Sequence, residues 1–269
     1  MWASTHAELT KLVRRPANWL LLAVALALSL TFTYLVPYAG ADGPTADRGV
    51  ASTFPNHLVG NSIGGWPVFA GAIALILGVL AAGGEYGWGT WKTVLAQGPS
   101  RLSVYTGKLA AIGLAVLVMV LTLFAAGAVT STAIATAEGA AMNWPSVGDL
   151  AGGVGAGWLI AMMWAMLGVV LAVGLRGVAM PIGLGLVWLM AVQNLLTSVA
   201  APLLDWVAEA QKGLPGPNAG SLVAALGSSP QTPGVAELVG SGQAAAVVAA
   251  YLVVFGVLGG LLLRRRDIL

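Results

Sequence analysis

The sequence predicts an all-helical membrane protein with six transmembrane helices. Hydrophobic residues make up 58% of the 269 residues and charged residues only 8%, whereas soluble domains carry about 25% charged residues. A soluble globule of this size needs charged side chains on its surface. The few charged residues are also spaced so widely that long charge-free stretches separate them. Most of the surface is therefore expected to face lipid.

Seven stretches lack Asp, Glu, Lys and Arg, and each exceeds the length of about 20 residues that crosses a bilayer. They are 16–41, 49–84, 109–137, 150–175, 177–204, 213–236 and 238–263. The stretch 213–236 contains four prolines with glycines between them, and so broken a backbone cannot satisfy its own hydrogen bonds in lipid. Six spans remain, and we place them near 17–38, 66–83, 109–131, 152–175, 178–200 and 243–263.

The distribution of Lys and Arg predicts the orientation, because these residues concentrate on the cytoplasmic side of membrane proteins. With six spans and a cytoplasmic N-terminus, ten of the twelve lie inside, and only Arg48 and Lys212 lie outside. A seventh span would move Arg264–Arg266 outside and spoil this bias. We therefore expect a multi-pass plasma-membrane protein with both termini in the cytoplasm and one transmembrane domain over 1–269.

The last outer connection, 201–242, has two recognisable parts. Residues 203–212 read Leu-Leu-Asp-Trp-Val-Ala-Glu-Ala-Gln-Lys, a pattern typical of a short amphipathic helix at the membrane interface. Residues 219–226 are apolar but too short to span. We expect this second part to dip into the membrane and return on the same side.

Composition excludes several classes of function. A net charge of +2 is too small for a nucleic-acid-binding surface, and a chain with no cysteine and two histidines offers no metal site. Residues 60–64, Gly-Asn-Ser-Ile-Gly, match a serine-nucleophile pattern. That chemistry needs a base beside Ser62, and glycine-rich loops produce the pattern readily by chance. No catalytic site is expected.

The predicted spans carry no charged residue away from their ends, which argues against a proton-coupled carrier and against a charged pore. Gln193 and Asn194 form the strongest uncharged polar pair in any span. Such residues either make hydrogen bonds between helices or line a transport path. Both interpretations stay open for this pair.

The N-terminal residues predict an amphipathic helix lying at the interface. Thr5 and Glu8 have the spacing of a capping box, and Leu9, Leu12 and Val13 then form an apolar face. Pro16 ends this helix before the first span. The charged residues expected to face the headgroups are Glu8, Lys11, Arg14 and Arg15. The segment is either a functional elbow or a simple positive-inside anchor.

The inner connection 84–108 is longer than the usual two to eight residues between helices. Glu85 suits the positive end of a helix that starts there, and Trp88, Trp91 and Leu95 share one face of it. Gly98-Pro99 is a helix stop. This face either docks on a partner or lies on the headgroups, where tryptophan is common.

Together these two segments resemble type-2 ABC exporter permeases. The N-terminal residues similar to that family are Glu8, Lys11, Leu12, Arg14, Pro16 and Trp19, with one extra residue before the proline. In the loop they are Glu85, Gly89, Thr90, Leu95, Pro99, Arg101, Gly107 and Lys108. The six-span layout and the broken outer segment before the last span are similar as well.

The resemblance implies a dimer of permease chains, or of this chain and a paralogue, coupled to cytoplasmic ABC ATPase subunits. It makes 4–15 the elbow helix, with Glu8, Lys11, Leu12, Arg14 and Arg15, and 85–98 the coupling helix. The residues implied to contact the ATPase are Glu85, Trp88, Gly89, Thr90, Trp91, Leu95 and Arg101.

ATP and Mg²⁺ would bind only the partner ATPase, and this chain would hold no cofactor. Its one Gly-Lys pair, Gly107-Lys108, is followed by Leu109, where a phosphate-binding loop needs Ser or Thr. We expect export of an apolar or amphipathic substrate by alternating access. The alternative is a membrane scaffold without transport activity, whose inner loop binds a signalling or assembly partner.

Overall fold

The structure is a computed structural model, and it describes residues 2–40, 48–87 and 100–265. Every regular element in these ranges is helical. Six helical segments are long and apolar enough to cross a membrane, which confirms the predicted number and order of spans. They are Pro16–Ala39, Phe69–Tyr86, Arg101–Ala137, Val147–Leu175, Ala179–Leu203 and Ser241–Arg265.

The first two helices meet at a sharp bend. Helix α1 (Trp2–Arg14) ends at Arg15, which has an extended backbone (φ −84°, ψ 115°), and Pro16 opens α2 (Pro16–Leu30). Proline suits this first position because its missing N–H has no partner there in any helix. The predicted break at Pro16 is confirmed. The predicted capping box is wrong, because α1 already begins at Trp2 and Thr5 lies inside it.

Beyond α2, the chain turns back at the far end of the first span. A π-helical turn, η1 (Thr31–Leu35), leads into α3 (Val36–Ala39), which ends at Gly40 in the left-handed conformation (φ 59°). After Arg48, two short turns, η3 (Val50–Thr53) and η4 (Pro55–His57), precede α4 (Leu58–Ile63). Helix α4 is buried along its whole length.

The core of the bundle is the pair α5 (Phe69–Gly87) and α8 (Val147–Leu175). Glycines permit this close packing: a Cβ on Gly78 would lie 2.0 Å from the carbonyl oxygen of Ala165, and one on Gly168 would lie 2.2 Å from that of Leu75. Side chains larger than hydrogen would force the two backbones apart. The capping box of α8, Ser146 with Asp149, fixes where that helix begins.

Helix α7 (Arg101–Ala137) has 37 residues and is much longer than the predicted span 109–131. At 1.5 Å per residue it is about 55 Å long, against a hydrocarbon core of about 30 Å. Its N-cap is Ser100, whose side chain accepts a hydrogen bond from the N–H of Ser103 at 3.2 Å. The extra turns at its start place Lys108 inside the helix, packed on α1.

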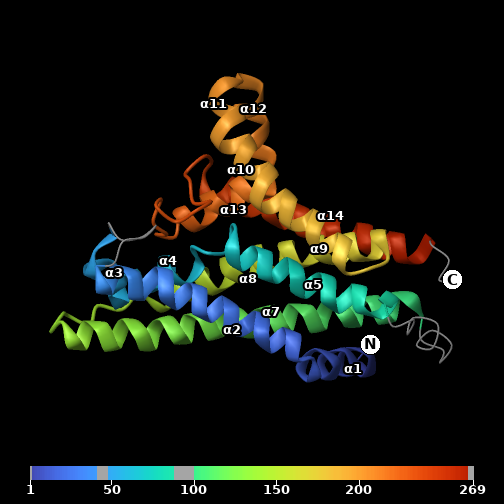
Figure 1. Cartoon of the computed structure of the whole chain (residues 1–269), viewed down its shortest axis with the longest axis horizontal. Helices are drawn as coiled ribbons and strands as arrows, with labels where there is room; N and C mark the ends of the chain where they lie inside the picture. Colours follow the sequence, from blue (N-terminus) through green and yellow to red (C-terminus); the bar gives the residue numbers. More distant parts are fainter. Residues whose placement is uncertain (1, 41–47, 88–99, 266–269) are drawn as a thin grey trace.

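The fifth candidate span leaves the bundle at an angle, as Figure 1 shows for the segment from α9 to α11. It is a continuous helical run with two π-helical stretches. Its parts are α9 (Ala179–Leu186), η5 (Val187–Val192), α10 (Gln193–Leu195), η6 (Leu196–Ala200) and α11 (Ala201–Leu203). Only 17% of its most apolar part is buried, so most of its side chains face outward.

Between the fifth and sixth candidate spans, residues 204–240 of the described chain contain no further candidate span. The predicted amphipathic helix appears as α12 (Asp205–Ala210) and η7 (Gln211–Gly213), with Val207 buried and Trp206 exposed. Helix α13 (Pro215–Ala224) has ten residues, is buried from Pro215 to Val223, and packs on α14 (Ser241–Arg265). The dip of 219–226 into the membrane stays a prediction.

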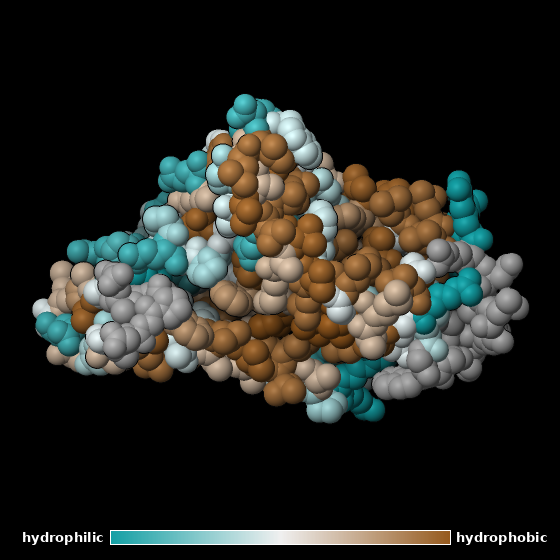
Figure 2. Space-filling view, turned by 45° about the horizontal axis from the view of Figure 1, so that its top comes forward, coloured by the Kyte–Doolittle hydropathy of each residue, from teal (hydrophilic) through white to brown (hydrophobic). Residues whose placement is uncertain are grey.

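Helix α1 and the last described turn of α14 lie at the same end of the bundle (Figure 1). We call this end the termini end; it also includes the last turn of α5 and the first turns of α7. Figure 2 shows hydrophobic residues across the middle of one face, with hydrophilic residues gathered toward both ends. This distribution suits a bundle surrounded by lipid.

Candidate functional site: a buried ion cluster at the termini end

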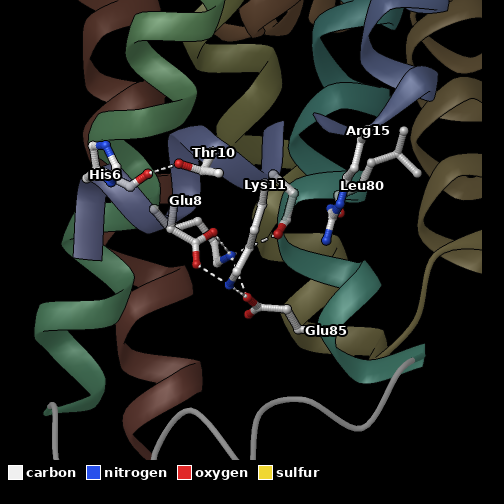
Figure 3. A network of polar contacts seen from close by, with 9 residues as sticks. His6, Glu8, Thr10, Lys11, Arg15, Leu80 and Glu85 are labelled. Carbon is white, nitrogen blue, oxygen red and sulfur yellow. Dashed lines mark hydrogen bonds and ion pairs between the residues drawn. The ribbon is translucent and has the colours of Figure 1, made fainter. Parts of the chain in front are cut away.

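Four charged residues from three helices meet at the termini end. Glu8 and Lys11 come from α1, Glu85 from the last turn of α5 and Lys108 from α7; together they form the ion cluster. The Lys11 ammonium lies 2.6 Å from Glu8 Oε1 and 2.8 Å from Glu85 Oε1. The Lys108 ammonium lies 2.5 Å from Glu8 Oε2 and 3.2 Å from Glu85 Oε1. Figure 3 shows Glu8, Lys11 and Glu85 converging.

The ion cluster is shielded from solvent and electrically balanced. The side chains of Lys108 and Glu85 are each 2% exposed and that of Glu8 is 7% exposed, so only Lys11 reaches the surface. Two positive and two negative charges cancel, which is how charged groups are tolerated in a protein interior. Removal of any one of them would leave another charge buried without full compensation.

The pKa values of the α1 residues reflect this balance. Burial favours a neutral carboxyl at Glu8, but the charges and hydrogen bonds of Lys108 and Lys11 hold the pKa of Glu8 below its ordinary value. Burial likewise opposes charge on Lys11, yet Glu8 and Glu85 raise its pKa above the ordinary value. Both groups are therefore charged across the neutral range.

Helix α1 approaches the bundle through Gly107. A Cβ on this residue would lie 2.8 Å from the Ser4 Cβ and 3.1 Å from the Thr5 nitrogen, so only glycine lets the two helices come so close. The next residue, Lys108, donates a further hydrogen bond of 2.9 Å to the carbonyl oxygen of Ala81. The Gly107-Lys108 pair thus supplies both the space and the charge that dock α1.

A second contact fixes the bend after α1. Arg15 donates a hydrogen bond of 2.8 Å from its guanidinium to the carbonyl oxygen of Leu80 in α5, as seen in Figure 3. Glycine at position 84 leaves room for this guanidinium, which lies 3.4 Å from where a Cβ would be. Helix α1 is therefore bound to α5 through Lys11, and the bend after α1 is bound to α5 through Arg15.

The prediction that the charged residues of the first helix face the headgroups is wrong for Glu8, which points into the bundle with its side chain 7% exposed. Of the predicted apolar face, Leu12 is buried in the bundle, whereas Val13 is 59% exposed on the surface. Arg14 is exposed. The helix is thus held by a buried charged stripe as well as by an apolar one.

Glu85 also differs from its prediction. The sequence favoured a position at the start of a helix, whereas the structure places Glu85 in the last turn of α5, paired with two lysines. Arg101 is the first residue of α7 and donates a hydrogen bond of 3.3 Å to the carbonyl oxygen of Leu263 in α14. The other predicted coupling residues, Trp88, Gly89, Thr90, Trp91 and Leu95, lie outside the described residues.

The two polar residues of the fifth span, Gln193 and Asn194, differ in burial. Gln193 is buried, and its side-chain oxygen occupies the space in which a Cβ on Gly216 would lie. Asn194 is exposed and donates a hydrogen bond of 2.7 Å to the carbonyl oxygen of Met190. Both line a cavity of about 290 Å³ between the fifth span and α13. That this cavity lies on a transport path stays a prediction.

Sequence reasoning noted Lys108 only as part of a family pattern and missed its pairing. One signal could have found it: the cation lies directly before the charge-free stretch 109–137, and an ionisable residue next to membrane-embedded helices needs a partner. The partners are 100 and 23 residues away in the chain. Their identity is a tertiary property that no local pattern encodes.

These features define a multi-pass membrane protein whose N-terminal helix is docked by buried ion pairs onto the end of the second candidate span and the first turns of the third. The sequence matches the family described as ABC-2 family transporter protein over residues 5–192. The chain belongs to this family of ABC transporter membrane permeases. The permease domain itself lacks ATPase activity, and ATP is hydrolysed by a partner subunit. A search among curated proteins gives no significant match.

Proposed function

We propose that this chain is the membrane-spanning subunit of an ATP-driven exporter, and that it couples to cytoplasmic ABC ATPase subunits through residues 85–98. In this proposal both termini lie in the cytoplasm, because ten of twelve Lys and Arg residues then lie inside. The termini end becomes the cytoplasmic end, and α1 becomes the elbow helix.

The ion cluster is the observation that carries this proposal. Glu85 lies just before residues 88–99 and Lys108 lies nine residues after them, and both are paired with the same helix, α1. A force applied to the loop by an ATPase would therefore act on α5, α7 and α1 together. Because separating buried opposite charges costs several kcal/mol, the three helix ends would move as one unit.

Alternating access fits the remaining architecture. The fifth span stands away from the bundle and exposes a row of large apolar side chains that either a second permease copy or lipid can cover. The row includes Leu184, Val187, Leu195, Val199 and Leu203. We propose that a dimer forms along this span and that Gln193 and Asn194 lie beside the path of an apolar or amphipathic substrate.

The experiment uses the permease reconstituted in liposomes with its ATPase partner, and it measures both ATPase binding and substrate-stimulated ATP turnover. Glu8→Gln should retain the ATPase but lower the stimulation several-fold, because the loop is then less firmly tied to α1. Glu138→Gln, a change at an exposed position after α7, is the matched control. Failure of the wild-type chain to recruit any ABC ATPase would contradict the proposal and favour the scaffold alternative.

A further inference from the structure

A second polar cluster lies in the half of the bundle away from the ion cluster. A cavity of about 160 Å³ there is enclosed mainly by apolar side chains from α2, η1, α5 and α7, and six polar residues line part of it. The polar residues are Ser29, Thr33, Arg48, Asn61, Ser62 and Thr232. We call this space the Arg48 cavity. No element of the proposed ATPase coupling uses it.

Arg48 is a half-buried cation without an acidic partner among the described residues. It donates one hydrogen bond of 2.7 Å to Asn61 Oδ1, and its Nε is buried without an acceptor. Asn61 in turn donates a hydrogen bond of 2.8 Å to the carbonyl oxygen of Ser52. Because a guanidinium has five N–H donors and stays charged in proteins, support of this loop uses a small part of its capacity.

Ser62 gives an independent indication of a ligand. It is 5% exposed and lines the Arg48 cavity, and its hydroxyl lies beside the buried hydroxyl of Tyr34. A serine hydroxyl has one donor and two acceptor positions, so this neighbour leaves part of its hydrogen-bonding capacity for a ligand. A serine hydroxyl and a guanidinium both donate hydrogen bonds to oxygen atoms, and both residues line this cavity.

The rest of the lining is suited to a hydrocarbon chain. Leu28, Phe32, Phe69, Ile73 and Leu123 all contribute to it. Phe32 and Phe69 are 42% and 44% exposed on the apolar surface, so the cavity adjoins the surface that lipid covers. A molecule could therefore enter laterally with its tail in the membrane.

We propose that the Arg48 cavity binds an amphipathic anion, with a carboxylate or phosphate headgroup on Arg48 and Ser62 and a single alkyl chain between α2 and α5. The planar guanidinium matches the two oxygens of such a headgroup. The apolar lining excludes water from the chain. This site goes beyond the proposed ATPase coupling and does not depend on it, because it is defined by binding alone.

The test is photolabelling of the full chain in phosphatidylcholine nanodiscs with dodecanoate that carries a diazirine near the end of its chain. The matching alcohol, 1-dodecanol with the same diazirine, has the same tail and no charge. We expect dodecanoate to label residues around Leu28 and Ile73 at least about ten-fold more than the alcohol, since a charged hydrogen bond contributes about that factor. Nanodiscs containing phosphatidylglycerol distinguish the source: suppression of labelling there assigns the site to a phospholipid headgroup, and retention assigns it to a free single-chain amphiphile.

Three variants make the test specific. Arg48→Gln should abolish the advantage of dodecanoate over the alcohol, and Arg48→Lys should keep part of it. Lys212→Gln, at an exposed cation outside the cavity, should change nothing. Ala70→Leu should reduce labelling by both probes, because Ala70 lines the cavity and is 8% exposed. Equal labelling by acid and alcohol in the wild-type chain, or an undiminished advantage in Arg48→Gln, would overturn the proposal.

Discussion

The ammonium group of Lys108 lies 2.5 Å from the carboxylate of Glu8, although the two residues are 100 positions apart in the chain. This contact joins the N-terminal helix to the start of α7, and the same ammonium lies 3.2 Å from Glu85 at the end of α5. Three helix ends are thus held by one buried cation.

Helix docking at Gly107 is expected to be sensitive to a single methyl group. Gly107→Ala would bring a Cβ within 2.8 Å of Ser4, so α1 must shift and the ion pairs must lengthen. Hydrogen exchange of residues 2–14 should accelerate at least several-fold. Gly113→Ala is the matched control in the same helix, because its nearest atoms lie 3.7 Å away. Equal exchange in both variants would show that α1 does not depend on this close approach.

Loss of one charge from the ion cluster should destabilise the protein. Glu8→Gln removes a carboxylate whose side chain is 7% exposed, and breaking a buried pair in this way costs about 3 kcal/mol. The thermal unfolding midpoint in detergent should therefore fall by several degrees. In the double variant Glu8→Gln with Lys108→Met, part of the loss should return because no unpaired charge stays buried. A double variant that is as unstable as the sum of both single ones would argue against direct coupling.

The pKa shifts of Glu8 and Lys11 predict the pH range over which α1 stays docked. The lowered pKa of Glu8 gives stabilisation that is complete above about pH 4.3, the ordinary glutamate value, and is lost as the pH falls through the lower folded-state value. The raised pKa of Lys11 gives stabilisation that is complete below about pH 10.4 and is lost as the pH rises through the higher folded-state value. The difference in unfolding midpoint between wild type and Glu8→Gln should be constant near neutrality and should shrink in acid. A difference that grows in acid would contradict this sign.

The orientation can be measured directly, since the chain has no native cysteine. Cysteines at Asp205 and Glu237, which are exposed on either side of α13, should both react with an impermeant thiol reagent in intact cells. A cysteine at Leu269 should react only after the membrane is opened. Reaction at Leu269 in intact cells would reverse the predicted orientation.

The spans could be predicted from the sequence because hydrophobic length and the spacing of charges are local properties. The environment of the charged residues of α1 could not be predicted, for a physical reason. Glu8 and Lys11 lie near a membrane surface, where contact with solvated headgroups is the usual environment. These two side chains are drawn into the bundle only because α7 approaches α1 at Gly107 and α5 approaches it at Glu85. The start of α1 was also missed, since the capping pattern at Thr5 competes with a helix that already begins at Trp2.

The coupling role of residues 85–98 is the central claim, and the variant Trp88→Ala with Trp91→Ala tests it most directly. Removing two large apolar side chains from a packed contact costs about 2–5 kcal/mol or more, which would weaken a modest interface at least about 30-fold. Membrane insertion should be unchanged because the spans are intact. The measurement is the amount of ABC ATPase that co-purifies with the permease after detergent extraction. We predict that the double variant loses most of it while Glu138→Gln retains it; full retention of the ATPase by the double tryptophan variant would contradict the account.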